Sequence, residues 1–101
     1  NYGVESTLLL FRSTDKLAIH QLKDTIERNM RALDIMSTAT VNGVYTIVIL
    51  FPFADTSAVE GFLERLGRYI DISNESKSVE VGRFLISQMP LVQSFIYREK
   101  Q

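Results

Sequence analysis

The chain has 101 residues, of which 46% are hydrophobic and 23% charged, with a net charge of −1. This fits one soluble domain with one core. The lack of a basic excess argues against nucleic-acid binding. Without cysteine, disulfides, thiolate zinc sites and thiol catalysis are excluded, which fits a cytoplasmic location.

The apolar stretches are too short for a membrane helix, which needs roughly 20 residues. The longest runs from residue 44 to residue 54 and contains Thr46 and Pro52. We therefore expect no membrane contact by this segment. We take residues 1–101 to be a single domain cut from a longer protein, and that parent is compatible with membrane attachment elsewhere.

The first third of the chain predicts a strand followed by a long helix. Residues 7–11 are almost continuously apolar, as in a central strand buried on both faces. Residues 13–15, Ser-Thr-Asp, offer helix-capping side chains. From residue 16 to residue 33, apolar residues recur at spacings of three and four, which predicts an amphipathic helix. Its buried stripe is Ile19, Leu22, Ile26, Met30 and Leu33.

A β-hairpin is predicted next. Asn42-Gly43 separates two β-rich runs, residues 37–41 and 45–51, and is the strongest short-range hairpin signal. Gly and Asn tolerate positive φ better than other residues. The second run is strongly β-branched, which favours a central strand, and Pro52 ends it.

The remaining chain predicts a second helix and a last strand. Residues 55–57, Asp-Thr-Ser, offer capping groups, and Ser57 with Glu60 has the spacing of a capping box. The apolar stripe of this helix is Val59, Phe62, Leu63, Leu66 and Ile70. Residues 79–86 predict a strand with a candidate bulge at Gly82, broken before Pro90. Residues 91–101 fit either a short helix or an edge strand.

This order, β-α-β-β-α-β, predicts an α+β ferredoxin-like fold with both helices on one face of an antiparallel sheet. The aromatic residues are expected in the core rather than stacked on nucleic-acid bases, because residues 44–50 carry no positive charge. These residues are Tyr45, Phe51, Phe53, Phe62 and Phe84.

Four stretches resemble the diguanylate cyclase, or GGDEF, domain in a shortened, degenerate form. Residues 31–34, Arg-Ala-Leu-Asp, match the Arg-x-x-Asp inhibitory site of that family, and residues 43–52 match its signature turn and following strand. Residues 64–66 and 78–82 match its later helix and strand. The resemblance covers residues 6–87.

The departures from this family fall on its catalytic positions. Tyr45 and Thr46 stand where the turn supplies a metal-binding acid, and Phe11 and Arg12 stand where the first strand supplies another. Two metal ions require clustered carboxylates to hold them against phosphates. The resemblance therefore implies a domain that is not an enzyme and carries no metal or other cofactor.

Degenerate GGDEF domains of the kind found in Pel polysaccharide secretion act as receptors for cyclic di-GMP. By this resemblance the chain is a receptor in bacterial exopolysaccharide or signalling control. Arg31 would grip guanine, Asp34 would pair with its N–H groups, and Arg65 or Arg68 would assist. Other expected partners are a neighbouring domain of the same protein and a second copy of the chain.

Simpler interpretations stand beside these assignments. Arg31 and Asp34 also fit a solvated pair that stabilises a helix end by about 0.3 kcal/mol, and Arg68 fits an i,i+4 surface pair with Glu64. A second Arg-x-x-Asp, residues 12–15, fits a strand-to-helix loop capped by its Asp. His20 fits a partly exposed helix position.

Two other functions remain open from the sequence. The domain could serve only as a structural docking or dimerisation module that binds no nucleotide. Alternatively, it could be another small-molecule regulatory module with the same fold.

Overall fold

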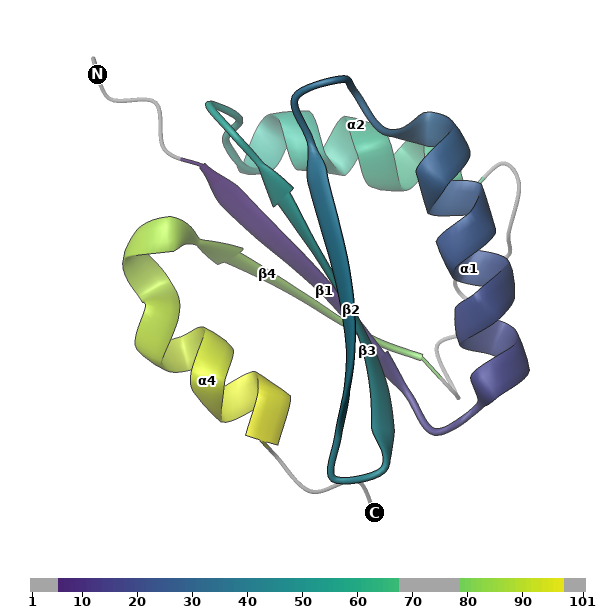
Figure 1. Cartoon of the computed structure of the whole chain (residues 1–101). Coiled ribbons are helices and arrows are strands. Elements are labelled where there is room, and N and C mark those ends of the chain that lie inside the picture. Colours follow the sequence, from purple (N-terminus) through teal and green to yellow (C-terminus); the bar gives the residue numbers. More distant parts are fainter. Residues whose placement is uncertain (1–5, 68–78, 98–101) are drawn as a thin grey trace.

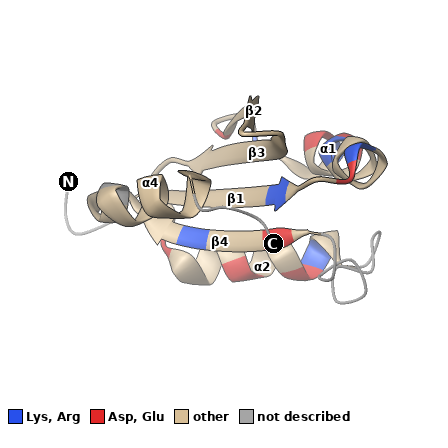
Figure 2. Ribbon diagram, turned by 90° about the horizontal axis from the view of Figure 1, so that it is seen from below, with Lys and Arg blue, Asp and Glu red and all other residues tan. Residues whose placement is uncertain are grey.

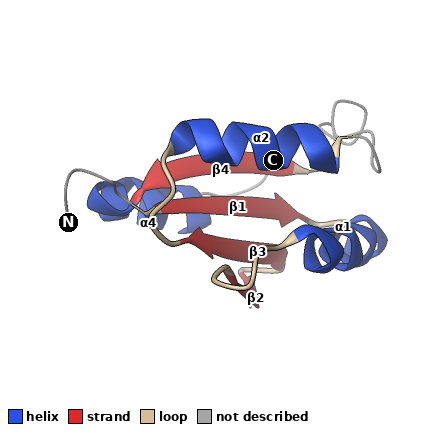
Figure 3. Cartoon of the chain, turned by 90° about the horizontal axis from the view of Figure 1, so that it is seen from above, coloured by secondary structure: helices blue, strands red, loops and turns tan. Residues whose placement is uncertain are grey.

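The computed structural model describes residues 6–67 and 79–97, which form a four-stranded antiparallel sheet with helices on both faces. The strand order is β2-β3-β1-β4 (Figure 3). Helices α1 and α2 cover one face, and α4 covers the other (Figure 1). The elements are β1 (Thr7–Ser13), α1 (Lys16–Asn29), β2 (Ile35–Val41), β3 (Val44–Phe51), α2 (Thr56–Leu66), β4 (Glu80–Leu85), a short 3-10 turn (Ile86–Gln88) and α4 (Met89–Tyr97). The predicted ferredoxin-like fold is confirmed.

Strand β1 lies between two apolar cores, and all seven of its residues are buried. Leu9 and Phe11 pack with α1 and α2 on one face, while Leu8 and Leu10 pack against α4 on the other. Successive side chains of a strand point to opposite faces, so an unbroken apolar run suits a strand covered on both sides. The prediction of a central strand here is confirmed.

Helix α1 begins as predicted but ends four residues early. Asp15 caps it by accepting hydrogen bonds from the N–H groups of Leu17 and Ala18. The backbone is already extended at Met30, with ψ at 148°, and Leu33 is 65% exposed. The predicted helix to residue 33 is wrong because β2 must start at Ile35 to pair fully with β3.

The predicted β2–β3 hairpin is confirmed, and its second strand begins at Val44, one residue earlier than predicted. Asn42 and Gly43 have φ values of 53° and 77°, and Val41 pairs with Val44 across a two-residue turn. Two positive φ values define the turn type whose twist matches the flanking strands. Strand β2 begins at Ile35, two residues before its predicted start, and β3 is central as expected.

Helix α2 is capped by Asp55, which accepts from the N–H of Ala58. The predicted capping box is wrong because Ser57 lies inside the helix and the carboxylate of Glu60 pairs with Arg83 of β4. The helix ends at Leu66. Two predicted members of this helix, Arg68 and Ile70, lie outside the described residues.

Strand β4 and the last helix differ from expectation at three points. Gly82 sits directly opposite Leu10 in an unbroken ladder, so the expected bulge is absent from this strand. The strand ends at Leu85, and Pro90 lies in the first turn of α4, where its missing N–H is tolerated. Residues 89–97 form a helix, which settles the open alternative for residues 91–97, whereas residues 98–101 lie outside the described residues. Val92 anchors the helix to the sheet.

Phe53 is the one predicted core aromatic that faces solvent. Phe51 and Phe62 are buried and their rings meet edge to face with centroids 5.0 Å apart, whereas Phe53 is 73% exposed. Its φ of 55° lies in the left-handed region, which is unfavourable for a bulky residue. Its N–H donates to the hydroxyl of Ser6. The prediction that Phe53 is a core residue is wrong.

Replacing Phe53 by asparagine should raise the free energy of unfolding by about 0.5–1 kcal/mol. The left-handed conformation costs most residues about 1–2 kcal/mol, and asparagine tolerates it better. Little buried area is lost, since the ring is exposed. Urea denaturation measures the change. Phe53→Ala is the control: an equal gain there would point to loss of the ring rather than relief of strain.

Charged side chains gather on α1, α2 and β4, while β2 and β3 carry none (Figure 2). None of the helices in the described ranges is both long and apolar enough to span a bilayer.

Candidate functional site

The loop between α1 and β2 holds Arg31 and Asp34 in a closed arrangement. The backbone N–H of Arg31 donates to one carboxylate oxygen of Asp34 at 2.8 Å, and its Nε donates to the other at 2.9 Å. The N–H of Asp34 donates back to the carbonyl of Arg31. A further guanidinium nitrogen, Nη2, lies 2.8 Å from Asp34 Oδ1 and donates to the carbonyl of Pro52 at 3.2 Å. The Asp34 carboxylate and the Pro52 carbonyl, from two different segments, therefore fix one guanidinium.

The two side chains of this motif differ sharply in exposure. The Asp34 side chain is 0% exposed, whereas 47% of the Arg31 side chain is accessible. The carboxylate thus faces the protein and the guanidinium faces outward. The expected helical i,i+3 geometry is wrong, because both residues follow the end of α1, but the two do pair.

Arg65 joins Arg31 at one pocket of about 360 Å³ between the α1–β2 loop and α2. The guanidinium of Arg65 lies over the ring of Phe62, with its central carbon 5.9 Å from the ring centroid. The pocket is lined by Arg31, Asp34, Phe51, Ser57, Ala58, Gly61, Phe62 and Arg65. The structure thus brings three of the four predicted ligand residues together, and Arg68 lies outside the described residues.

Sequence reasoning missed two contributors to this pocket. The Pro52 carbonyl holds Arg31 from 21 residues away, a contact that no local pattern signals. Gly61 lies inside α2, where glycine lowers helix stability by about 1 kcal/mol relative to alanine. A glycine inside a helix leaves space beside it. The glycine at position 61 of a predicted helix was therefore the feature of the sequence that could have indicated a pocket.

The second Arg-x-x-Asp has a structural role. Asp15 caps α1 as expected, but Arg12 lies within β1 rather than in the loop, and its side chain is 1% exposed. It donates to Glu80 at 3.0 Å. His20 is exposed on α1, as expected.

The chemistry available at the Arg31 pocket is recognition of a flat, electron-rich or anionic group. Two guanidiniums line it, and the carboxylate among its described lining residues, that of Asp34, is engaged with Arg31. Arginine presents planar donors that fit a phosphate or the O6/N7 edge of guanine. Within residues 6–67 and 79–97 no group of three His, Cys, Asp or Glu side chains could hold a metal ion.

Comparison with known proteins agrees with this fold. A family model described as the PelD GGDEF domain matches residues 1–91. A crystal structure of a PelD fragment from Pseudomonas aeruginosa PAO1 superposes with a TM-score of 0.74 at 19% identity, covering 94% of this chain and 37% of that one. A PelD fragment from Pseudomonas aeruginosa PA14 in complex with c-di-GMP gives 0.73 at 17% identity, covering 93% and 38%.

The designed protein Foldit4 also matches, with a TM-score of 0.52 at 18% identity, covering 79% of this chain and 92% of that one. The chain spans about two fifths of the length of the two PelD structures described above. No curated protein sequence matches it. The resemblance to degenerate GGDEF domains, drawn from residues 6–87, is confirmed by the family match.

Proposed function

Because this chain belongs to the PelD GGDEF domain family, we propose that it is a non-catalytic receptor domain for cyclic di-GMP. The observation that carries the proposal is the pocket where Arg31 and Arg65 converge. Arg31 binds a guanine edge or a phosphate oxygen, and Arg65 supplies a second positive charge to the same ligand. A PelD structure in complex with c-di-GMP supports this choice of ligand.

In this proposal Asp34 does not contact the ligand but positions Arg31. Its carboxylate is covered and accepts from Arg31 Nε and from the backbone N–H, so it aims the guanidinium. The direct pairing of Asp34 with guanine N–H groups that the motif suggests requires the loop to uncover the carboxylate, whose side chain is 0% exposed. Arg68, three residues after Arg65 in the sequence, is proposed as an additional phosphate contact.

The wider setting follows from the family. We propose that the domain acts in bacterial exopolysaccharide control from the cytoplasm, within a longer protein whose neighbouring domain it contacts. Catalysis is absent in this proposal because the carboxylates needed for two metal ions are replaced by Tyr45, Thr46, Phe11 and Arg12.

Calorimetric titration of the chain with cyclic di-GMP tests the proposal. We expect micromolar binding that Arg31→Ala weakens by about tenfold to hundredfold, since a charge-assisted hydrogen bond contributes about 1.5–3 kcal/mol. Arg28→Ala is the matched control, because Arg28 is an exposed arginine in the last turn of α1, three residues before Arg31, and does not line the pocket. Equal losses in the two variants would contradict the site.

Gly61→Leu tests the same pocket without changing any charge. The leucine side chain would occupy the space that Gly61 leaves, so binding should fall while helix propensity improves. A thermal melt shows that the variant is folded. Unchanged affinity in a folded Gly61→Leu protein would place the ligand elsewhere.

The structural alternative draws support from apolar side chains near this loop. Leu33, Ile35 and Phe53 are 65%, 58% and 73% exposed. Leu33 and Ile35 lie where β2 begins, and Phe53 follows the end of β3, which pairs with that part of β2. They suit docking against a neighbouring domain or a second copy. A folded chain that binds no cyclic di-GMP would favour this function.

A further inference from the structure

Strand β2 forms an open edge of the sheet. It comes last in the strand order and pairs on one side only, with β3. Figure 3 shows it as the outermost element on its side of the sheet, with no described helix beyond it. Helix α1 packs chiefly against β1 and β3, so it covers a face of the sheet and not this edge. The outer side of β2 is therefore accessible to a further strand.

The sequence of β2 has none of the features that usually protect a sheet edge. Natural edge strands avoid association through charged side chains, proline, bulges or short length. Residues 35–41, Ile-Met-Ser-Thr-Ala-Thr-Val, include no charged residue, proline or glycine, and all seven pair with β3 in unbroken register. Five of the seven are exposed. This edge is thus long, regular and uncharged.

The opposite edge of the described sheet, β4, is built differently. It carries Glu80, which binds Arg12, and Arg83, which pairs with Glu60 of α2. Charged groups of this kind protect an edge from association. An added strand is therefore expected at β2 rather than at β4.

The β2–β3 turn determines which backbone groups of β2 point outward. In an antiparallel ladder, pairs of residues that exchange backbone hydrogen bonds alternate with pairs that do not. Val41 and Val44 flank a two-residue turn, whose usual closing hydrogen bond joins these two residues. Counting back from Val41 in steps of two, alternate residues of β2 direct their N–H and C=O groups toward β3. The groups that point outward are those of Met36, Thr38 and Thr40.

The side chains of β2 are complementary to a second copy of the same strand. Antiparallel pairing of two β2 strands engages all seven residues when Thr38 lies opposite Thr38 of the other copy, on a two-fold axis. Ile35 then lies opposite Val41, and Ser37 lies opposite Ala39. Branched apolar side chains thus meet each other, and small side chains meet each other. Because the strand is uncharged, no like charges meet across the axis.

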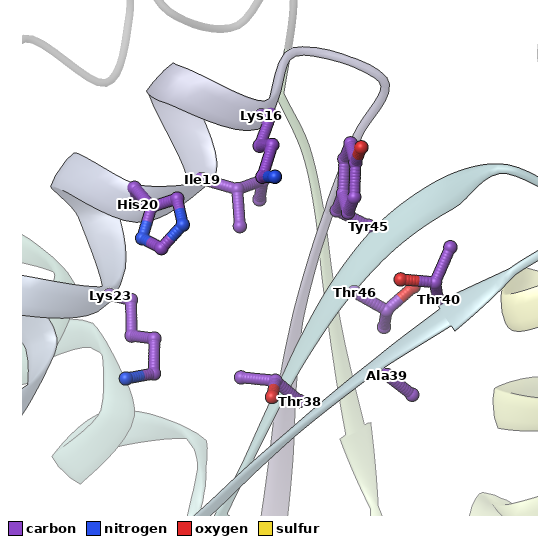
Figure 4. Close-up of a pocket in the computed structure, with 9 residues that line it drawn as sticks. All are labelled: Lys16, Ile19, His20, Lys23, Thr38, Ala39, Thr40, Tyr45 and Thr46. Atoms are coloured by element: carbon purple, nitrogen blue, oxygen red, sulfur yellow. The ribbon is translucent and has the colours of Figure 1, made fainter.

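The backbone groups match in the same register. Thr38 presents its N–H and C=O groups to the same groups of its copy, so the two residues exchange both hydrogen bonds. Met36 lies opposite Thr40 of the other copy, and both present outward groups. Figure 4 shows the alternation of side chains along β2, with Thr38 on the side that faces α1 and Ala39 on the other. Side chains and backbone therefore favour one and the same register.

From these observations we propose that β2 is a self-association surface, through which two copies of the chain form one continuous antiparallel sheet. The interface is isologous, so it consumes both β2 edges and assembly stops at the dimer. The paired strands are about 24 Å long, which gives less contact than a standard interface of about 1,200–2,000 Å². We therefore expect a weak dimer, with a dissociation constant of about 100 μM. No residue of β2 lines the Arg31 pocket, so the proposal goes beyond ligand binding.

Sedimentation velocity of the 101-residue chain tests the proposal. We expect mainly monomer at about 10 μM and mainly dimer at about 1 mM, with no larger species. A chain that stays monomeric at the higher concentration would overturn the proposal and leave this edge to a strand of a different protein. Larger, open-ended assemblies would overturn the two-fold pairing. No ligand is present, so the outcome does not depend on the cyclic di-GMP proposal.

Amide hydrogen exchange at the same two concentrations locates the contact. The amides of Met36, Thr38 and Thr40 should exchange about fivefold more slowly at 1 mM, because only about one fifth of the chain is then monomeric. The amides of Ser37 and Ala39 already face β3, so their exchange should change little. A dimer in which the three outward amides are not slowed would place the contact elsewhere and overturn the proposal.

Charged variants of Thr38 test the position of the two-fold axis. Thr38→Lys and Thr38→Glu each place like charges opposite each other, so each should weaken self-association by about tenfold. An equimolar mixture of the two should recover a dimer, because opposite charges then meet. Val81→Lys is the matched control, since Val81 is an exposed residue of the other edge strand, β4. Equal weakening by Val81→Lys, or no recovery in the mixture of folded variants, would overturn the pairing.

Discussion

Replacing Arg12 by alanine is expected to lower the free energy of unfolding by about 2–4 kcal/mol. Among the residues that the structure describes, Arg12 is the largest almost fully buried side chain. It donates to Glu80 at 3.0 Å, and its guanidinium carbon lies 5.4 Å from the ring centroid of Phe95. The substitution removes packing under α4 and leaves the Glu80 carboxylate, which is 30% exposed, without this donor. Urea denaturation of the variant measures the loss.

Arg12→Met separates packing from charge. It keeps most of the buried chain, so its loss should be smaller than that of Arg12→Ala. A double-mutant cycle of Arg12→Met with Glu80→Gln should give a coupling energy of about 1–2 kcal/mol. Equal losses for Met and Ala, with no coupling to Glu80, would contradict the packing and pairing described here.

Gly82→Val should destabilise the chain by about 1–3 kcal/mol, the usual effect of overpacking. A Cβ at this position would lie 2.8 Å from Phe84 Cε2 and 3.1 Å from two ring atoms of Phe95. These rings form an edge-to-face pair, with centroids 5.7 Å apart, that joins β4 to α4. Valine would force the pair apart, although valine itself favours a strand more than glycine does. Chemical denaturation again gives the change.

Rescue by a smaller ring partner checks this account of Gly82. In a Phe84→Leu background the added valine should cost less than in the native chain, because the closest ring atom is gone. The opposite sign is equally informative. If Gly82→Val stabilises the native chain through strand propensity alone, the rings do not depend on the space that the glycine provides.

The parts of the fold that could be predicted from the sequence are those set by local patterns. The apolar run of β1, the periodic stripe of α1 and the Asn42-Gly43 turn each act over a few residues, and each is confirmed. The end of α1 could not be predicted, because no glycine or proline marks it. It is set by β2, whose pairing with β3 must reach Ile35, and that is a tertiary constraint.

Burial of a charge was equally invisible in the sequence. Arg12 is buried because Glu80, 68 residues later, is its neighbour across the sheet. Phe53 was expected in the core with the other aromatic residues, yet the turn formed by Pro52 and Phe53 directs it outward. The burial of Arg12 thus depends on a segment distant in the sequence, whereas the exposure of Phe53 depends on its own left-handed backbone conformation.

In the candidate site, too, some features could be predicted from local sequence patterns and others could not. The Arg31-x-x-Asp34 spacing pointed to the guanidinium, and the helical position of Arg65 pointed to its neighbour. The backbone carbonyl of Pro52 holds Arg31 from a third segment, and no motif in the sequence marks it. Gly61, on the same helix as Arg65, leaves space in the pocket, and only its low helix propensity signalled this.

Because the guanidinium of Arg31 is fixed in the folded chain, its side chain loses conformational entropy during folding and not during ligand binding. A free arginine side chain carries about 2 kcal/mol of rotamer entropy. Hydrogen bonds to Asp34 and Pro52 restrict this side chain before any ligand arrives. The ordering therefore belongs to folding rather than to association, so a ligand at Arg31 meets a preorganised donor and its affinity retains that much more of the contact energy.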